Sequence, residues 1–130
     1  TGNLEPIGWL KMESLGLKPL FTSPPLGGFG TDFMGWDISK PASDRAELLR
    51  AARAKANAAM AAAEEAAVER HIHIGDAPYD IQAAEMAGCV PIGVTTGIFS
   101  EDVLRKASKN PDALVVLSSL ESTEVDALVL

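Results

Sequence analysis

Residues 71–84 have the sequence HIHIGDAPYDIQAA, and this stretch decides the fold class. Two isoleucines alternate with two histidines, a pattern that predicts a short β-strand. Gly75 ends this strand and allows a close turn, and Pro78 suits the first turn of a helix, where its missing N–H costs nothing. Apolar residues then continue at helical spacing as far as Gly88, which suits the end of a helix. The stretch therefore predicts a strand, a tight turn and a helix.

Two carboxylates, Asp76 and Asp80, lie four residues apart at the carboxyl end of this strand. In open α/β sheets that edge is where ligands bind. Mg²⁺ is typically held by one or two protein carboxylates, while water and substrate phosphate oxygens complete its shell. In the alternative interpretation, Asp76 caps the helix and Asp80 lies in its first turn, where the helix dipole favours negative charge. The spacing alone leaves both interpretations open.

Composition limits the kind of protein. A chain of 130 residues has the size of one ordinary domain, and 47% hydrophobic with 22% charged residues predicts a globular one. The net charge of −7 argues against a nucleic-acid partner or an anionic membrane surface. Cys89 is the single cysteine, which excludes an internal disulfide and suits a reducing, intracellular compartment.

The sequence has neither a membrane-spanning apolar run nor a signal-peptide pattern, so we expect a soluble protein. It begins with Thr1 rather than Met, so we expect that this is not the natural start of translation.

Strands alternate with helices after the central stretch. Residues 90–94 and 113–117 are apolar runs that predict two further buried strands. Ser100 suits the N-cap of a helix between them, and residues 121–130 predict a short terminal helix. This alternation predicts an α/β fold with a parallel, doubly wound sheet.

The first half of the chain predicts two helices joined by a long loop. Asn3 suits the N-cap of the first helix. Residues 17–42, rich in proline and glycine, predict a long loop with one short strand near Phe29. Asp44 followed by Glu47 has the form of a capping box that opens an alanine-rich helix over about residues 44–68.

His71 and His73 share one face of the predicted strand, so a pair of metal ligands is conceivable. No third ligand is evident nearby in the sequence. We favour ordinary strand histidines.

The central stretch also carries a resemblance to a known family. Residues 75–84, with Ala87-Gly88 and the segment Ile92-Gly93-Val94-Thr95-Thr96-Gly97, resemble the fourth motif of the haloacid dehalogenase superfamily of phosphohydrolases. The similarity is greatest to its phosphoglycolate-phosphatase-like branch. Thr1-Gly2-Asn3 resembles the second motif of that branch, and a helix and the glycine-rich residues 27–32 follow it as in the family. The resemblance covers nearly the whole chain and is weakest across residues 33–42 and 57–69.

This resemblance implies a Rossmann-like three-layer sandwich around a parallel sheet, with residues 1–130 forming the C-terminal part of one core domain. In the family the nucleophilic aspartate lies in a DxDx(T/V) motif on the first strand, and no such motif occurs in this sequence. The chain would then lack the first two core strands and the cap domain. We therefore expect the chain alone to be an incomplete domain with exposed apolar surface and no turnover.

The activity that the resemblance implies is a Mg²⁺-dependent phosphatase acting on a small phosphorylated metabolite, such as phosphoglycolate, through an aspartyl phosphate. It implies Asp76 as a direct Mg²⁺ ligand and Asp80 as a second ligand or as a group that orients water. It also implies that the Thr1 hydroxyl holds the phosphoryl oxygens, joined by the backbone amides of Gly2 and Asn3.

The family's third motif is a basic residue that neutralises the phosphoryl oxygens, and two residues resemble it. Lys40 precedes Pro41, as in the common Lys-Pro form of the motif. Arg45 keeps the better offset to the following helix and resembles the Asp-Arg form that accompanies Thr-Gly-Asn. We favour Arg45, and for each residue a solvated surface cation is the alternative.

Other functions stay open at this point. One is a non-catalytic module of the same superfamily that binds a partner or ligand. Another is a dehalogenase, although that chemistry needs no cation and fits badly with the Asp76–Asp80 pair. A dinucleotide-binding domain is disfavoured because no G-x-G-x-x-G follows a strand. The sequence carries no signal of the oligomeric state.

Overall fold

The computed structural model describes residues 1–33, 35 and 39–121. The chain forms two compact units, Thr1–Glu69 and Arg70–Leu130, and each is described by itself. The terminal helix expected over residues 121–130 falls almost wholly on residues outside the described part of the chain. Among the described residues, no helix combines the length and the apolar character that a membrane crossing requires.

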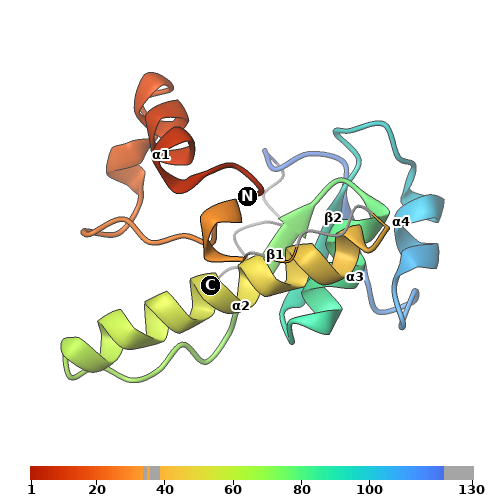
Figure 1. Cartoon of the computed structure of the whole chain (residues 1–130). Helices are drawn as coiled ribbons and strands as arrows, with labels where there is room; N and C mark the ends of the chain where they lie inside the picture. The colour runs from red at the N-terminus through yellow and green to blue at the C-terminus, as the bar shows by residue number, and fades with distance from the viewer. Residues whose placement is uncertain (34, 36–38, 122–130) are drawn as a thin grey trace. The chain divides into compact units, whose positions relative to one another are not determined.

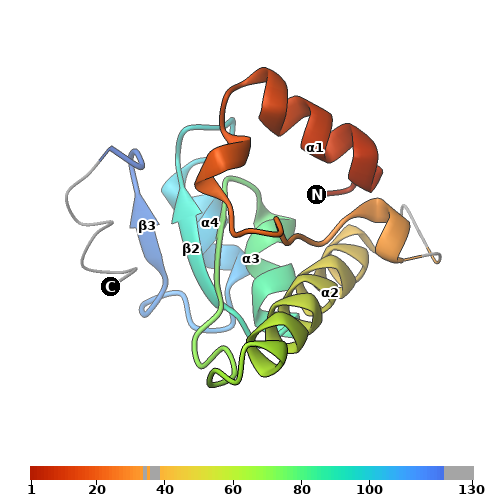
Figure 2. The ribbon, with the colours of Figure 1, turned by 90° about the vertical axis from the view of Figure 1, so that its left-hand side faces the viewer.

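The second unit is built on a three-stranded parallel sheet in the order β1-β2-β3. Figure 1 labels β1 and β2, and Figure 2 labels β2 and β3. The strands are β1 (Ile72–Gly75), β2 (Val90–Val94) and β3 (Val115–Leu117). The register pairs Ile74 with Ile92, and Ile92 with Val115. The α/β fold with a parallel sheet is therefore confirmed, and β3 is shorter than the apolar run that predicted it.

Two helices connect these strands: α3 (Pro78–Met86) joins β1 to β2, and α4 (Glu101–Ala107) joins β2 to β3. Because the strands follow one another in sequence order, right-handed crossovers place both helices on the same face of the sheet. The helices contact each other and the sheet (Figure 1). Between them lies a core cluster of Ile81, Leu104 and Leu114.

The sheet is apolar on both faces. Gly93 faces α4, where an added Cβ would lie 3.2 Å from Leu104 Cδ1. The alternate residues make a second core cluster on the opposite face, consisting of Ile92, Val94 and Leu117 with Ile72, Ile74 and Val115 packed against it. Parallel sheets with two apolar faces are typical of the middle layer of α/β proteins.

The first unit contains α1 (Glu5–Ser14), two 3₁₀ turns, η1 (Lys18–Leu20) and η2 (Gly30–Asp32), and α2 (Pro41–Ala62). The N-cap of α1 is Leu4, so the prediction of Asn3 at this position was wrong. The Asn3 side chain is engaged elsewhere, because it donates to Thr1 Oγ1 and accepts from Lys11 Nζ.

Helix α2 begins earlier than predicted. Its N-cap is Lys40 and Pro41 is its first residue, so the capping box of Asp44 and Glu47 was a wrong prediction. Pro41 has a backbone angle already suited to a first helical turn, which extends the helix upstream. Asp44 consequently lies within the first turn and is only 4% exposed.

Helix α2 also ends at Ala62 rather than near residue 68. Glu64 then adopts a positive φ of 58°, and the chain turns back. The N–H of Val68 donates to Asn57 Oδ1 at 2.9 Å, which fixes the returning segment against the helix. High helix propensity in the alanine-rich end was not sufficient, because that end has little apolar surface to bury.

No strand forms near Phe29, contrary to the sequence prediction. Phe29 precedes η2, is 4% exposed, and donates its N–H to Asp32 Oδ2 at 2.8 Å instead of to a neighbouring strand. The loop before it lies very close to α2, because an added Cβ on Gly28 would overlap the Leu48 carbonyl. Only glycine allows this close approach.

Candidate active site

The carboxylate of Asp76 lies at the carboxyl edge of the sheet. Because β1 and β2 are parallel, the residues that follow them meet at this edge. Asp76 directly follows β1, and Gly97 is in the loop after β2. An added Cβ on Gly97 would overlap Asp76 Oδ2 and lie 2.9 Å from Asp76 Cγ. The absence of a side chain at Gly97 therefore makes the space that this carboxylate fills.

Asp80 occupies the first turn of α3 and is 6% exposed. Its Oδ2 accepts the backbone N–H of Ala77, the N-cap residue of α3, at 3.3 Å. Its Cγ would lie 2.8 Å from a Cβ added to Gly75. Asp76 is thus not the helix cap, and Asp80 has a structural contact at the helix start in addition to any ligand role.

These two carboxylates fit a Mg²⁺ ion better than a metal that demands many side-chain ligands. The described residues contain no group of three or more His, Cys, Asp or Glu side chains that could hold a metal. Mg²⁺ needs only one or two carboxylates, because water and phosphate oxygens fill its other positions. The glycines beside Asp76 and Asp80 leave room for both carboxylates at one turn. Asp76 and Asp80 are therefore the candidate carboxylates for a Mg²⁺ site.

His71 lies at the opposite edge of the sheet from Asp76, and His73 lies within β1. His71 precedes β1 and Cys89 precedes β2, so both lie at the amino ends of the strands. His71 Nδ1 is 3.3 Å from Cys89 Sγ. Among the described residues, no group of three or more His, Cys, Asp or Glu side chains that could hold a metal is found, and the interpretation of His71 and His73 as ordinary strand histidines stays a prediction.

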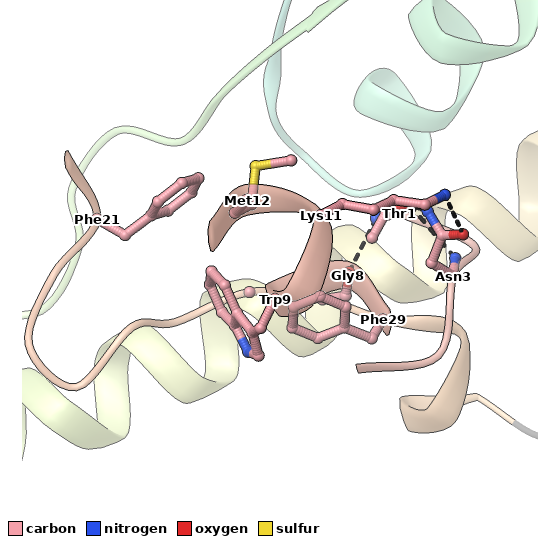
Figure 3. Close-up of a pocket in the computed structure, with 10 residues that line it drawn as sticks. Thr1, Asn3, Gly8, Trp9, Lys11, Met12, Phe21 and Phe29 are labelled. Carbon is pink, nitrogen blue, oxygen red and sulfur yellow. Dashed lines mark hydrogen bonds between the residues drawn. The ribbon is translucent and has the colours of Figure 1, made fainter. Parts of the chain in front are cut away.

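The segment Thr1-Gly2-Asn3 is held against the glycine-rich loop of the first unit. The Thr1 amino group donates to Gly28 O at 2.8 Å, and Gly30 N–H donates to Asn3 O at 2.8 Å. Thr1 Oγ1 accepts from Asn3 Nδ2 at 2.9 Å and from the Asn3 backbone N–H at 3.3 Å. Lys11 Nζ donates to Asn3 Oδ1 at 3.1 Å. Figure 3 shows Thr1, Asn3 and Lys11 close together.

Arg45 lies near enough to Thr1 for its positive charge to act on the Thr1 amino group. Burial lowers the pKa of the Thr1 amino group, and the positive charge of Arg45 lowers it further, while Asp32 opposes the shift. Within the described part of the chain, Lys40 is not among the charges that shift this pKa. The choice between Arg45 and Lys40 as the residue of the third motif stays a prediction. Both basic residues and Thr1 belong to the first unit, whereas Asp76 and Asp80 belong to the second.

Lys55 organises the glycine-rich loop, a role that sequence reasoning missed. Its Nζ donates to Asp32 Oδ2 at 2.9 Å and to Gly27 O at 3.1 Å, and lies 5.5 Å from the Phe29 ring centroid. Burial would raise the pKa of Asp32, but the hydrogen bonds from Lys55 and from the Phe29 N–H lower it below its ordinary value. The only signal in the sequence is a basic residue within the alanine-rich helix.

A family described as HAD-hydrolase-like matches residues 42–122 of the chain. The matched range includes Arg45, Asp76 and Asp80, whereas Thr1 and Lys40 lie outside it. No curated protein matches the chain. The family match spans well over half of the sequence and agrees with the parallel α/β sheet. The chain therefore belongs to the haloacid dehalogenase superfamily of hydrolases.

Proposed function

We propose that this chain is the C-terminal part of a Mg²⁺-dependent phosphatase that acts on small phosphorylated metabolites through an aspartyl phosphate. The observation that carries the proposal is the Asp76 carboxylate seated against Gly97 at the carboxyl edge of the sheet, one turn from Asp80. Superfamily membership supports hydrolase chemistry, and the resemblance of residues 75–84 and 92–97 to the motif of the phosphoglycolate-phosphatase-like branch suggests a small anionic substrate. The nucleophilic aspartate lies upstream in this proposal, because the sequence contains no DxDx(T/V) motif.

Asp76 and Asp80 hold the cation in this proposal. When bound, Mg²⁺ offsets the repulsion between an attacking carboxylate and an anionic phosphate and stabilises charge in the transition state. The bond from the Ala77 N–H fixes the position of Asp80. Gly97 leaves the space in which Asp76 can face the ion.

Thr1 and Arg45 bind the phosphoryl group in this proposal. The Thr1 hydroxyl can donate to a phosphoryl oxygen while Asn3 Nδ2 holds the hydroxyl oxygen in place. The Asn3 backbone N–H, whose bond to Thr1 Oγ1 is long at 3.3 Å, and the Gly2 N–H are further donors. Arg45 supplies the positive charge, and Lys40 is the alternative.

Hydrolysis of p-nitrophenyl phosphate by the full-length protein, with and without Mg²⁺, tests this function. We expect Mg²⁺-dependent turnover, and we expect Asp76→Asn to lower kcat by about a thousandfold, a loss typical of removing one electrostatic stabiliser. Asp112→Asn, which removes an exposed carboxylate elsewhere in the second unit, is the matched control and should leave kcat unchanged. The 130-residue chain alone should show no turnover.

Two outcomes would contradict the proposal. One is wild-type kcat in Asp76→Asn, and the other is turnover that does not depend on Mg²⁺. A full-length protein that folds but hydrolyses no phosphomonoester would favour a non-catalytic module of the superfamily instead.

A further inference from the structure

A pocket of about 270 Å³ lies within the first unit, beside Thr1 (Figure 3). Helix α1 forms one wall and the glycine-rich loop forms the other. Small-molecule sites commonly have volumes of about 300–1,000 Å³, so this pocket suits a ligand with a single ring system. The metal site and the phosphoryl-binding residues proposed above do not account for its aromatic part.

One end of the pocket is aromatic. The Trp9 ring meets Phe21 edge-on with centroids 5.3 Å apart, and meets Phe29 with centroids 5.1 Å apart. Gly8 and Gly27 permit this arrangement, because a Cβ on either residue would lie within 3.0 Å of the Phe29 ring. Phe21 is 42% exposed, so its ring is accessible to a ligand. Perpendicular rings of this kind favour a further flat ring, which can stack on one and meet the other edge-on.

The other end of the pocket is polar and positively charged. Figure 3 shows Lys11, Thr1 and Asn3 together at this end, away from Trp9 and Phe21. Lys11 Nζ is anchored on Asn3 Oδ1 at 3.1 Å, which fixes the ammonium group at the pocket rim. The Trp9 indole N–H is already engaged by Glu5 Oε1 at 3.3 Å, so the indole offers its apolar ring. The pocket thus combines an aromatic end with a cation and a hydroxyl.

We propose that this pocket binds the aromatic part of a phosphomonoester whose phosphate lies between Lys11 and Thr1. The inference rests on the proposed function in one respect, namely that Thr1 holds the phosphoryl group. It goes further by naming the substrate class: a phosphomonoester with one aromatic ring next to the ester oxygen. The Lys11 ammonium forms a charge-assisted bond to the phosphate, and Trp9 and Phe21 receive the ring.

Intrinsic fluorescence of Trp9 tests this proposal in the 130-residue chain. The sequence contains only one other tryptophan, so Trp36→Phe leaves Trp9 as the sole reporter. Phenyl phosphate, inorganic phosphate and phenol are titrated separately, in buffer containing a chelator. We expect a saturable change in emission, with a Kd for phenyl phosphate at least about tenfold lower than for either part alone, as linked contacts should give.

Two variants assign the two ends of the pocket. Lys11→Gln keeps a donor for Asn3 but removes the charge, and should raise the Kd for phenyl phosphate about tenfold. Lys18→Gln removes a lysine charge in the same unit, outside this pocket, and should leave the Kd unchanged. Phe21→Ala removes an exposed ring. It should weaken the binding of phenyl phosphate but leave the binding of inorganic phosphate unchanged.

Phenyl phosphate that binds no more tightly than inorganic phosphate would overturn the proposal, as would equal effects of Lys11→Gln and Lys18→Gln on the Kd.

The metal-free assay also separates this inference from the proposed function. Ring-dependent binding without Mg²⁺-dependent hydrolysis in the full-length protein would contradict only the proposed phosphatase activity. Hydrolysis by the full-length protein without any preference for an aromatic ring would contradict only the proposed role of the pocket.

Discussion

Asp80 offers a test that separates a structural role from a metal-binding role. Its carboxylate is 6% exposed and accepts the Ala77 N–H at 3.3 Å at the start of α3. Asp80→Asn keeps an acceptor oxygen of nearly the same shape but removes the negative charge. Asp80→Ala removes both. The pair of variants therefore divides the contribution of the hydrogen bond from that of the charge.

The expected losses of stability follow from these contacts. Losing an anion near a helix N-terminus costs about 0.3–1 kcal/mol, and this applies to both variants. Losing the acceptor for a helix-start N–H costs about 1 kcal/mol more, and this applies to Asp80→Ala alone. We therefore expect Asp80→Ala to lose about 1.5–2 kcal/mol and Asp80→Asn about 0.5 kcal/mol of unfolding free energy.

Urea unfolding followed by the NMR amide signals of β1 and α3 measures these losses in the second unit. The same series with Mg²⁺ tests ligand binding, because a cation at ten times its Kd stabilises the native state by about 1.4 kcal/mol. We expect that gain in the wild type and a clearly smaller one in Asp80→Asn. An undiminished gain in Asp80→Asn would refute the metal role of Asp80. Equal losses in the two variants would refute the importance of its bond to Ala77.

Three further changes test other parts of the structure. Leu104→Ala removes a side chain that is 0% exposed in the core between α3 and α4, so urea unfolding of the second unit should show a loss of about 2–5 kcal/mol. Asp32 has a folded-state pKa below its ordinary value of 3.8, so its stabilising effect is fully present above that value and is lost as the pH falls through the folded-state pKa. Acid titration of Asp32→Asn should accordingly show lower stability at neutral pH and a shallower loss below pH 3.8 in the first unit, and a profile parallel to that of the wild type would contradict the Lys55–Asp32 contact. Gly97→Ala should weaken Mg²⁺ binding in a calorimetric titration about tenfold or more, because its Cβ would displace the Asp76 carboxylate; unchanged affinity would contradict the placement of that group.

The sheet and its edge could be predicted because their signals are local. The alternation before Gly75 and the proline after it specified β1, the turn and α3 within a few residues. The apolar run over residues 90–94 likewise became β2 with the predicted bounds. Since parallel strands align their carboxyl ends, the position of Asp76 at the sheet edge followed from the order of the elements.

The helix starts of the first unit could not be predicted because several residues suited the same role. Asn3 is a good N-cap by type, but its side chain bonds to Thr1 and Lys11 instead. Asp44 and Glu47 matched a capping box, yet Pro41 supplied an earlier start for α2. In each case, tertiary contacts or a neighbouring proline decided between positions of similar propensity.

The pocket beside Thr1 could not be predicted from the sequence either. It depends on Trp9, Phe21 and Phe29, which come from α1 and from the loop after it, and Gly8 and Gly27 leave the room that the Phe29 ring needs. No spacing rule relates such residues. Lys55 posed the same difficulty, because its partners Asp32 and Gly27 lie 23 and 28 residues away.

The most direct test of the account is a Mg²⁺ titration of the chain, followed by the backbone amide signals of the second unit. We expect saturable shifts at residues 75–80 and 95–97, the two segments that flank the Asp76 carboxylate, and their loss in Asp76→Asn. Asp112→Asn serves as the control for a lost surface charge. Equal Mg²⁺-dependent shifts in the wild type and in Asp76→Asn, or shifts centred elsewhere, would contradict the assignment of the metal site to Asp76 and Asp80.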